Sequence, residues 1–408
     1  MDGAESLVVS AEPLMDVLVT CLNYPYPLEN GENLRIFHYV RALCARHTFD
    51  LVCRGSDDVP APLRGLFRHI IPVRGDVALP TGRLISRWAA PFSVRHVFPA
   101  IPDLTSALDG CLRARRYDLI WSAGDVLPRL PPQSGVPVLG DIVDDLVLQY
   151  SRLLASLRPG VRYLRVLKRL LLMKAVERRY FARADACLYV SEADAQTFAS
   201  VCPNIPVHVI HNGVDADFFQ PALVSVEPET VVFEGNMSFY PNVDAAEYFC
   251  KEILPLIHMA RPGVKLFLVG KDPSPRVRAL AADRIVVTGF VDDVRPYLAR
   301  AAVFVSPTRV GAGIKNKILQ AWSMGKPVVA TPASTGGLRV LDRKNLIIAD
   351  TPQRFADAVL ELLRDGKLGQ ELGLNGRRTV LDHYTWDAKA REFEALMSEL
   401  AIRRAKHA

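Results

Sequence analysis

Short apolar runs alternate with helix-length segments along most of the chain, and this pattern predicts parallel sheets covered by helices on both faces. A strand in such a sheet is shielded on both sides, so it reads as a near-continuous apolar run. Seven runs in the first half are predicted strands: 16–22, 49–55, 69–75, 117–124, 137–144, 186–193 and 206–213. After a connection rich in proline and valine (220–230), a second series of predicted strands follows: 231–235, 265–270, 284–290, 303–307, 326–331 and 345–350.

Helical periodicity fills the intervals of the second series. The expected helices lie near 244–257, 274–282, 294–302, 314–324 and 352–365. Two such series predict an α/β protein with two doubly wound, Rossmann-like domains, each with its ligand crevice at the carboxyl ends of its strands. We expect a loose leader (1–14), an N-terminal domain (15–212), a C-terminal domain (213–384) and a binding site in a cleft between the two.

Composition narrows the class of protein. The net charge of +6, from 50 basic and 44 acidic residues, is too small to indicate a nucleic-acid partner. The 7 cysteines show no CxxC spacing, which favours free thiols in a reducing compartment over a disulfide frame or a zinc site. The first 14 residues lack the basic start and apolar core of a signal peptide, and no uncharged apolar run approaches the roughly 18–20 residues of a membrane span. The sequence predicts a cytoplasmic protein and does not indicate its oligomeric state.

The stretch 308–331, TRVGAGIKNKILQAWSMGKPVVAT, reads as a glycine-rich loop, a helix and a strand. Gly311 and Gly313 let the backbone approach a ligand closely, and the predicted helix ends at a glycine. Lys315 and Lys317 lie in its first turn, where cations oppose the helix dipole. A bound anion, most simply a phosphate, would explain that placement. The alternative is a pair of solvated lysines at a loop edge.

A second informative segment, 23–43, follows the first predicted strand. Its prolines and Gly31 indicate a long loop at the crevice of the first sheet, and a helix is expected to begin near Asn33. His38 lies midway between two arginines at a spacing of three, so all three share one helical face. The alternative to a functional role is a capped helix with an arginine-bearing solvent face, which is preferred for His38. The functional interpretation places four residues over a substrate: Gly31, Glu32, Asn33 and Arg35.

Three acids follow the predicted strand near 137–144. Carboxylates at the carboxyl end of a strand can orient hydroxyls, act as a base or bind a cation. They serve equally well as turn and helix-start residues. Of Asp141, Asp144 and Asp145, the first leaves the strand earliest, so Asp141 is the chosen functional candidate.

The segment 151–179 carries many basic residues and a single acid, Glu177. Apolar residues recur at helical spacing among the arginines and lysines. A basic amphipathic helix can lie on an anionic membrane surface. It can also pack against its own domain with its basic side chains reaching solvent, and this second interpretation is preferred.

Five motifs together resemble the family 4 glycosyltransferases, which have the GT-B fold. They are HNGVDADFF (211–219), GNMSFYPNVDA (235–245), FLVGKDP (267–273), VVTGFVDDVRPYL (286–298) and GAGIKNKILQAWSMGKPVVAT (311–331). NGENLR, in the loop after the first predicted strand, is similar to members that build bacterial polysaccharides and glycoconjugates. The segment 384–397 resembles the closing helix of this fold, which implies that a helix over about 385–408 joins the N-terminal domain.

The resemblance implies that a nucleotide diphosphate sugar binds mainly to the C-terminal domain. Its sugar would pass to an acceptor hydroxyl with retained anomeric configuration. Lysines and a helix dipole can neutralise the leaving diphosphate, so no metal or other cofactor is implied. The implied donor contacts are Asn236, Gly270, Lys271, Gly289, Phe290, Val291, Gly311, Ala312, Gly313, Ile314, Lys317 and Gln320. The catalytic candidates are Asp141, Lys315 and Arg309, and a lipid-linked acceptor would call for peripheral contact with the inner membrane surface.

The chain departs from the family at two positions. Two glutamates typically stand eight positions apart across this loop and helix, and here the aligned residues are Ala312 and Gln320. A glutamine can still hydrogen-bond a ribose, whereas an alanine offers the sugar no polar group. Arg309 is a substitute contact for phosphate or sugar, with a surface arginine as the alternative. A catalytically silent GT-B partner subunit and a sugar-phosphate epimerase or phosphorylase therefore stay open as other functions.

Overall fold

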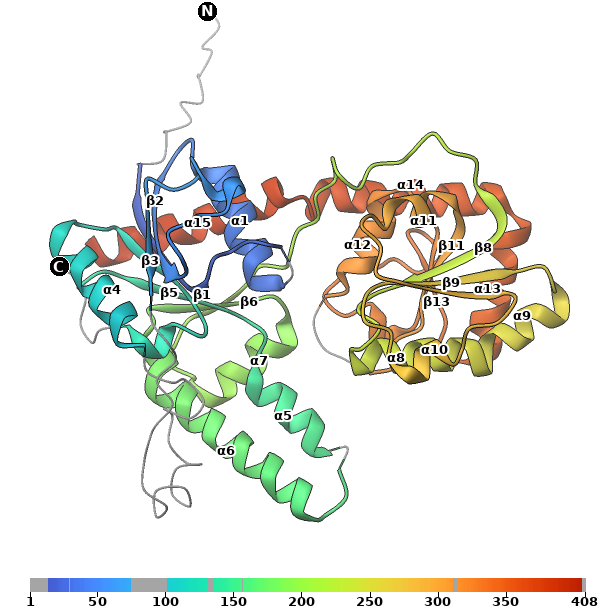
Figure 1. The fold of residues 1–408 in the computed structure, drawn as a ribbon, viewed down its shortest axis with the longest axis horizontal. Coiled ribbons are helices and arrows are strands. Elements are labelled where there is room, and N and C mark those ends of the chain that lie inside the picture. Colours follow the sequence, from blue (N-terminus) through green and yellow to red (C-terminus); the bar gives the residue numbers. More distant parts are fainter. Residues whose placement is uncertain are drawn as a thin grey trace, which may run out of the picture. The chain divides into compact units, whose positions relative to one another are not determined.

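A computed structural model describes residues 14–28, 30–74, 101–130, 135–155, 157–310 and 314–405. The chain divides into two compact units. The first extends to Tyr189 and includes Ala195–His208 and the segment from Ala390, and the second comprises Val190–Asp194 and Val209–Lys389. Both are α/β, so the predicted fold class is confirmed (Figure 1). The predicted leader falls outside the described residues, except for its last position.

The first unit is built on a seven-stranded sheet in the order β3-β2-β1-β4-β5-β6-β7. β1 pairs in parallel with both β2 and β4, so the strand order reverses direction between β1 and β4. Open α/β sheets bind ligands at such a switch point, beyond the carboxyl ends of the strands. The strands are Asp16–Asn23, Thr48–Arg54, His69–Val73, Leu119–Ala123, Val138–Val143, Ala186–Tyr189 and Val207–Val209.

Helices cover both faces of this sheet. They are α1 (Gly31–Leu43), η1 (Ala61–Leu63), α4 (Pro102–Ala114), η3 (Leu127–Arg129), α5 (Leu146–Ala155), α6 (Val161–Tyr180), η4 (Phe181–Arg183) and α7 (Glu192–Val201). α1 begins two residues earlier than expected, because Asn30 caps it by accepting a hydrogen bond from the Asn33 amide at 2.8 Å. α5 and α6 run side by side as a helical hairpin (green in Figure 1). Among the described residues, no helix has the length and apolar character that crossing a membrane requires.

The second unit contains a six-stranded sheet in the order β10-β9-β8-β11-β12-β13. Its strands are β8 (Glu227–Glu234), β9 (Lys265–Val269), β10 (Ile285–Gly289), β11 (Ala301–Ser306), β12 (Val328–Ala330) and β13 (Ile347–Ile348). Every neighbouring pair is parallel, and the order again reverses direction between β8 and β11. The carboxyl end of β8 is therefore the expected ligand edge of this domain.

The helices of the second unit are α8 (Tyr240–Tyr248), α9 (Leu254–Ala260), α10 (Pro275–Arg278), α11 (Arg295–Arg300), α12 (Asn316–Ser323), η6 (Pro332–Ser334), α13 (Pro352–Arg364) and α14 (Gly366–His383). The single helix expected over 244–257 is instead α8, a π-helical turn (η5, Phe249–Ile253) and α9. One apolar core packs Phe249 against Phe355 on one face of the sheet, and another surrounds Trp322 on the other face.

The last helix, α15 (Trp386–Ala405), contributes its carboxyl-terminal part to the first unit. The Phe393 ring stacks on Tyr39 with their centroids 4.7 Å apart and lies 4.5 Å from Trp121. Glu394 bonds the ring of His47 at 2.7 Å. The two ends of the sequence therefore share one hydrophobic core.

Candidate functional site

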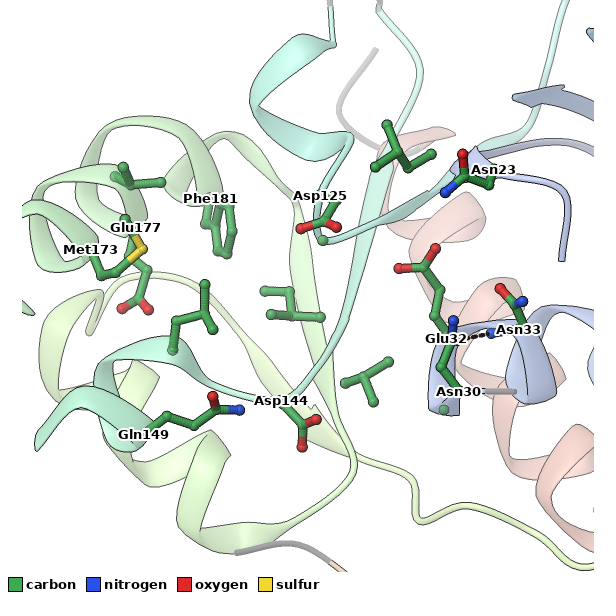
Figure 2. Close-up of a pocket in the computed structure, with 17 residues that line it drawn as sticks. Asn23, Asn30, Glu32, Asn33, Asp125, Asp144, Gln149, Met173, Glu177 and Phe181 are labelled. Carbon is green, nitrogen blue, oxygen red and sulfur yellow. Dashed lines mark hydrogen bonds between the residues drawn. The ribbon is translucent and has the colours of Figure 1, made fainter. Parts of the chain in front are cut away.

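The first unit contains a cavity of about 370 Å³ at the point where its strand order reverses (Figure 2). The loops after β1, β4 and β5 form its walls, together with the start of α1 and the inner side of α5 and α6. Its lining residues are Leu22, Asn23, Asn30, Gly31, Glu32, Asn33, Gly124, Asp125, Ile142, Val143, Asp144, Leu146, Gln149, Met173, Val176, Glu177 and Phe181. Carboxylates and amides alternate with apolar side chains around this wall, a mixture that suits a hydroxylated ligand with apolar ring edges.

Three of the four predicted acceptor-side residues, Gly31, Glu32 and Asn33, line this cavity. The fourth does not. Arg35 is completely buried, and its Nε bonds both carboxylate oxygens of Asp141 at 2.9 and 3.1 Å. The predicted place of Arg35 over a substrate is therefore wrong, and so is the alternative of a solvent face, because Arg35 neither lines the cavity nor reaches solvent. His38 shares that face and is only 4% exposed, so the solvent face preferred for it is wrong as well.

The choice among the three aspartates needs correction. Asp141 is 3% exposed, accepts a hydrogen bond from Trp121 Nε1 as well as from Arg35, and lies behind the cavity wall. It cannot act as a base without breaking a buried ion pair. Asp145 caps α5 by accepting from the Leu148 amide at 2.6 Å. Asp144 is the one that lines the cavity.

A tight turn explains why Asp144 faces the cavity. Val143 has a φ of 61°, which a β-branched residue rarely adopts, and the Asp144 amide donates to the Ile142 carbonyl at 2.7 Å. Backbone strain of this kind is typical of functional loops. The sequence did not reveal it, because nothing in the residues 142–144 requires a positive φ.

Sequence reasoning also missed Asp125 and Glu177. Asp125 lies just after the strand β4, and this position at the carboxyl end of a strand could have identified it as a candidate. Burial raises the pKa of Asp125, with Arg129 opposing the rise. Glu177 was noticed only as the single acid of a basic segment. It is 3% exposed, and burial, reinforced by Asp145 and opposed by Lys174, raises its pKa to about 9.

In the second unit, the predicted donor contacts gather at the carboxyl ends of β8, β9 and β10. Val269 of β9 pairs with Glu234 of β8 on one side and with Gly289 of β10 on the other. The three strands therefore end at the same position along the sheet, and the loops that follow them begin side by side. Gly270 has a φ of 143°, and a side chain there would overlap the carbonyl oxygen of Gly235. Glycine is therefore required where the two loops cross.

The individual donor candidates differ in what they can offer. The side chain of Asn236 accepts from the Ser238 amide and hydroxyl, which shapes its own turn. The Lys271 carbonyl accepts from the Met237 amide at 2.9 Å. Phe290 is 70% exposed beside the partly buried Val291, and presents an apolar surface to a ligand.

The lysines of the predicted phosphate loop occupy different environments. Gly311, Ala312 and Gly313 lie outside the described residues, and Ile314, Lys315 and Gln320 are partly buried. Lys317 points into the domain, where its Nζ donates to Asn242 Oδ1 at 2.8 Å and lies 4.4 Å from the Phe233 ring centroid. Burial lowers the pKa of Lys317 and raises that of the neighbouring Glu234. A solvated lysine pair is therefore excluded for Lys317, which contacts α8 and β8 instead.

Arg309 is fixed on α8. Its guanidinium donates to both carboxylate oxygens of Asp244 at 2.8 and 3.1 Å and lies 4.3 Å from the ring centroid of Tyr248. The side chain is 45% exposed. A substrate phosphate would have to compete with this bidentate ion pair, so Arg309 is a weaker catalytic candidate than the sequence suggested.

Comparisons with known proteins identify the family of the chain. Residues 30–218 match the model described as Glycosyltransferase Family 4, and residues 228–365 match the one described as Glycosyl transferases group 1. The chain belongs to glycosyltransferase family 4. Among solved structures, the complex of HepE from Anabaena with UDP and glucose has a TM-score of 0.61 at 15% identity, covering 94% of this chain and 99% of the other. That likeness supports the GT-B fold.

Curated relatives of this family 4 chain are similar over part of their length. The GDP-mannose-dependent alpha-(1-6)-phosphatidylinositol monomannoside mannosyltransferase of Mycobacterium tuberculosis (strain CDC 1551 / Oshkosh) is 30% identical over 53% of this chain and 62% of its own length. The lipopolysaccharide core biosynthesis glycosyltransferase LpsE of Rhizobium meliloti (strain 1021) is 30% identical over 31% of this chain. The chain spans 39% of LpsE, so both matches cover less than two thirds of the relatives.

Proposed function

We propose that this protein is a retaining glycosyltransferase that moves a sugar from a nucleotide diphosphate sugar to a hydroxyl of a glycan or lipid-linked acceptor. Membership of family 4 supports the reaction class. The observation that carries the proposal is the alignment of the loops after β8, β9 and β10 at one sheet edge, with a glycine where two of them cross. A donor lying there needs close backbone approach on one side and cations on the other.

Within that proposal the donor-side residues take separate roles. Lys315 lies two residues after the glycine-rich loop, at the amino end of α12, and neutralises charge on the leaving diphosphate. Lys317 holds Asn242 and thereby the loop that contains Gly235. The exposed ring of Phe290 covers the nucleotide base, and Gln320 hydrogen-bonds the ribose. No metal is assigned a role.

Nucleotide binding tests the donor assignment directly. Titration of the full chain with UDP, GDP, TDP and ADP should raise the melting temperature with one or more of these ligands. Lys315→Ala should weaken that binding about tenfold while the ligand-free melting temperature stays within one or two degrees, because a partly exposed cation contributes little to folding. Lys344→Ala, an exposed lysine in the same domain, is the matched control.

Three outcomes would remove parts of the proposal. Absence of stabilisation by any of the four diphosphates would favour the silent partner subunit. Unchanged affinity in the Lys315 variant would remove the phosphate role of that lysine. Turnover of nucleotide sugar that proceeds without an added acceptor would favour an epimerase over a transferase.

A membrane role for α6 is proposed on a separate observation. The helix buries Leu170, Met173 and Val176, which agrees with the preferred packing interpretation, but Leu164 and Leu171 remain 62% and 57% exposed. Exposed arginines accompany them at 162, 165 and 169. We propose that this exposed part of α6, with leucines on one side and arginines flanking them, rests on an anionic membrane surface while the domain takes a lipid-linked acceptor.

Vesicle sedimentation tests the membrane proposal. The protein should bind vesicles rich in phosphatidylglycerol several-fold more than phosphatidylcholine vesicles, and added salt should weaken the binding. Replacing Leu164 and Leu171 together by Glu should abolish it. Leu374→Glu, on the equally exposed Leu374 of α14, serves as control. Equal binding by both variants would contradict the proposal.

A further inference from the structure

The N-terminal cavity has an unusual charge pattern for a site in a sugar-transferring enzyme. Its wall carries four carboxyl side chains, Glu32, Asp125, Asp144 and Glu177, and among the described residues that line it there is no lysine, arginine or histidine. Phosphate and carboxylate ligands are held by guanidinium, ammonium or free amide groups. This wall is therefore unsuited to the anionic part of any substrate.

Basic groups near the cavity are directed elsewhere. Arg35 is bound to Asp141 behind the wall. Arg54 donates to the side-chain oxygen of Asn23, and Arg129 donates to the backbone carbonyl of Asp125. The amino end of α1 opens into the cavity, but Asn30 caps the amide of Asn33 and Glu32 lies in the first turn. None of these three arginine side chains is therefore directed at the cavity, and the Glu32 carboxylate opposes an anion at the start of α1.

Glu32 and Asp125 point toward one another across the cavity in Figure 2. Within the described part of the chain no hydrogen bond or ion pair reaches the Glu32 carboxylate, and Asp141 is its other acidic neighbour. Burial, together with Asp125 and Asp141, raises the pKa of Glu32 to about 7. Arg129 is a cationic neighbour of Asp125, but only acidic neighbours act on the pKa of Glu32. A positively charged ligand group between the two carboxyls would relieve their repulsion.

Glu177 supplies an independent sign of a ligand. It lines the apolar end of the cavity beside Met173 and Phe181, is 3% exposed, and its Oε2 has no hydrogen-bond partner among the described residues. Asp145 and Lys174 are its charged neighbours. Leaving a buried polar atom unpaired is unfavourable, so such an atom that faces a cavity indicates a partner that binds there.

The arrangement also limits the kind of cation. Among the described residues no group of three or more acidic, histidine or cysteine side chains could hold a metal ion together. The carboxyls are instead distributed around a space of about 370 Å³, with the amides of Asn23, Asn33 and Gln149 between them. An organic ammonium group on a hydroxylated ring matches that spacing and that mixture of acceptors and donors.

We propose that this cavity binds an acceptor sugar that carries a protonated amine. The ammonium lies between Glu32 and Asp125, and the protonated carboxyl of Glu177 donates to a ring hydroxyl at the opposite end. The proposal rests on the proposed transferase function and names the chemical class of its acceptor. It excludes an acceptor whose bound sugar is phosphorylated or carboxylated.

A matched set of three small sugars tests the charge preference. The probes are methyl glucosides with an amine, a hydroxyl or a phosphate at C6, titrated into the full chain at pH 7.5 and followed by ligand-observed NMR. The amine should bind at least fivefold more tightly than the hydroxyl compound, and the phosphate should not bind measurably. Equal binding of amine and hydroxyl sugars, or binding of the phosphate, would overturn the assignment.

Three variants test which residues cause the preference for the amine sugar. Glu32→Gln should remove the advantage of the amine over the hydroxyl, whereas Asp109→Asn, on α4 outside the cavity, should leave it unchanged. Glu177→Met should weaken both sugars by a similar factor of about three or more and keep their ratio, because it removes a hydrogen bond and not the cation site. A preference for the amine that survives in Glu32→Gln would contradict the proposed position of the ammonium.

The same samples separate this inference from the function on which it rests. Stabilisation by a nucleotide diphosphate without amine preference would contradict the acceptor class and leave the transferase in place. Amine binding in the cavity without any nucleotide binding would support the cation site and contradict the transferase.

Discussion

At the scale of single residues, the contribution of Glu177 to stability does not explain why a carboxyl is buried at this position. A buried carboxyl with an unpaired oxygen destabilises a domain, and a neutral isostere would fit the same space. Proteins commonly keep a destabilising residue where a functional site requires it. The pKa of about 9 lies far above the unfolded value of about 4, so the folded state holds a proton that the unfolded state releases between these two pH values.

This difference predicts how Glu177→Gln changes stability. The stability that the proton provides is complete below about pH 4 and is lost as the pH rises toward 9, and glutamine has no such dependence. The variant should therefore gain roughly 1–3 kcal/mol relative to the native chain between pH 5 and pH 8, as measured by urea unfolding. A variant whose stability runs parallel to that of the native protein across this range would show that Glu177 is ionised in the fold.

At the scale of elements, the ends of helices and strands form the sites. The cavity is built from the loops after β1, β4 and β5 and from the first turn of α1, and the donor edge is built from the loops after β8, β9 and β10. Parallel strands bring these loops to one edge while their interiors remain buried. The alternation of apolar runs predicted this edge, but not which side chains turn inward there.

Two helix caps, one beside the cavity and one far from it in sequence, allow the effect of a cap on stability to be distinguished from its effect on binding. Asn30 caps α1 beside the cavity, and Thr351 caps α13 by accepting from the Arg354 amide. Asn30→Ala and Thr351→Ala should each lower the free energy of unfolding by about 1 kcal/mol, because each leaves an amide without its partner.

Only Asn30→Ala should also weaken acceptor binding, since Gly31 and Glu32 depend on that cap. Chemical denaturation and sugar titration on both variants would measure this. Loss of acceptor binding in the Thr351 variant as well would indicate a general effect of lost stability.

At the scale of the whole molecule, the last helix returns to the first domain. Phe393 packs against both Tyr39 and Trp121. Glu394 binds His47, although 347 residues separate the two in the chain. The N-terminal core is therefore incomplete until the end of the chain is in place.

Phe393→Ala tests this closure. Removing the ring should destabilise the N-terminal unit by roughly 3–5 kcal/mol because it leaves a cavity in the core. Hydrogen exchange should show faster exchange in β1 and β4, while β8 and β11 keep their protection. Leu374→Ala, at an exposed position of α14, should change neither. Uniform loss of protection in both sheets would mean that the two cores unfold together.

The sequence alone determined the two series of strands and the motifs of the family, and it predicted the ligand edge of each sheet. These features depend on local periodicity and on short segments. Only the tertiary structure showed that Arg35 neutralises Asp141, that Lys317 turns into the domain, and that Asp125 and Glu177 belong to the cavity. Those facts depend on which side chains distant in sequence come together in space. Whether a side chain is buried, and which charge it pairs with, depends on the folded environment. Neither property can therefore be predicted from local sequence patterns.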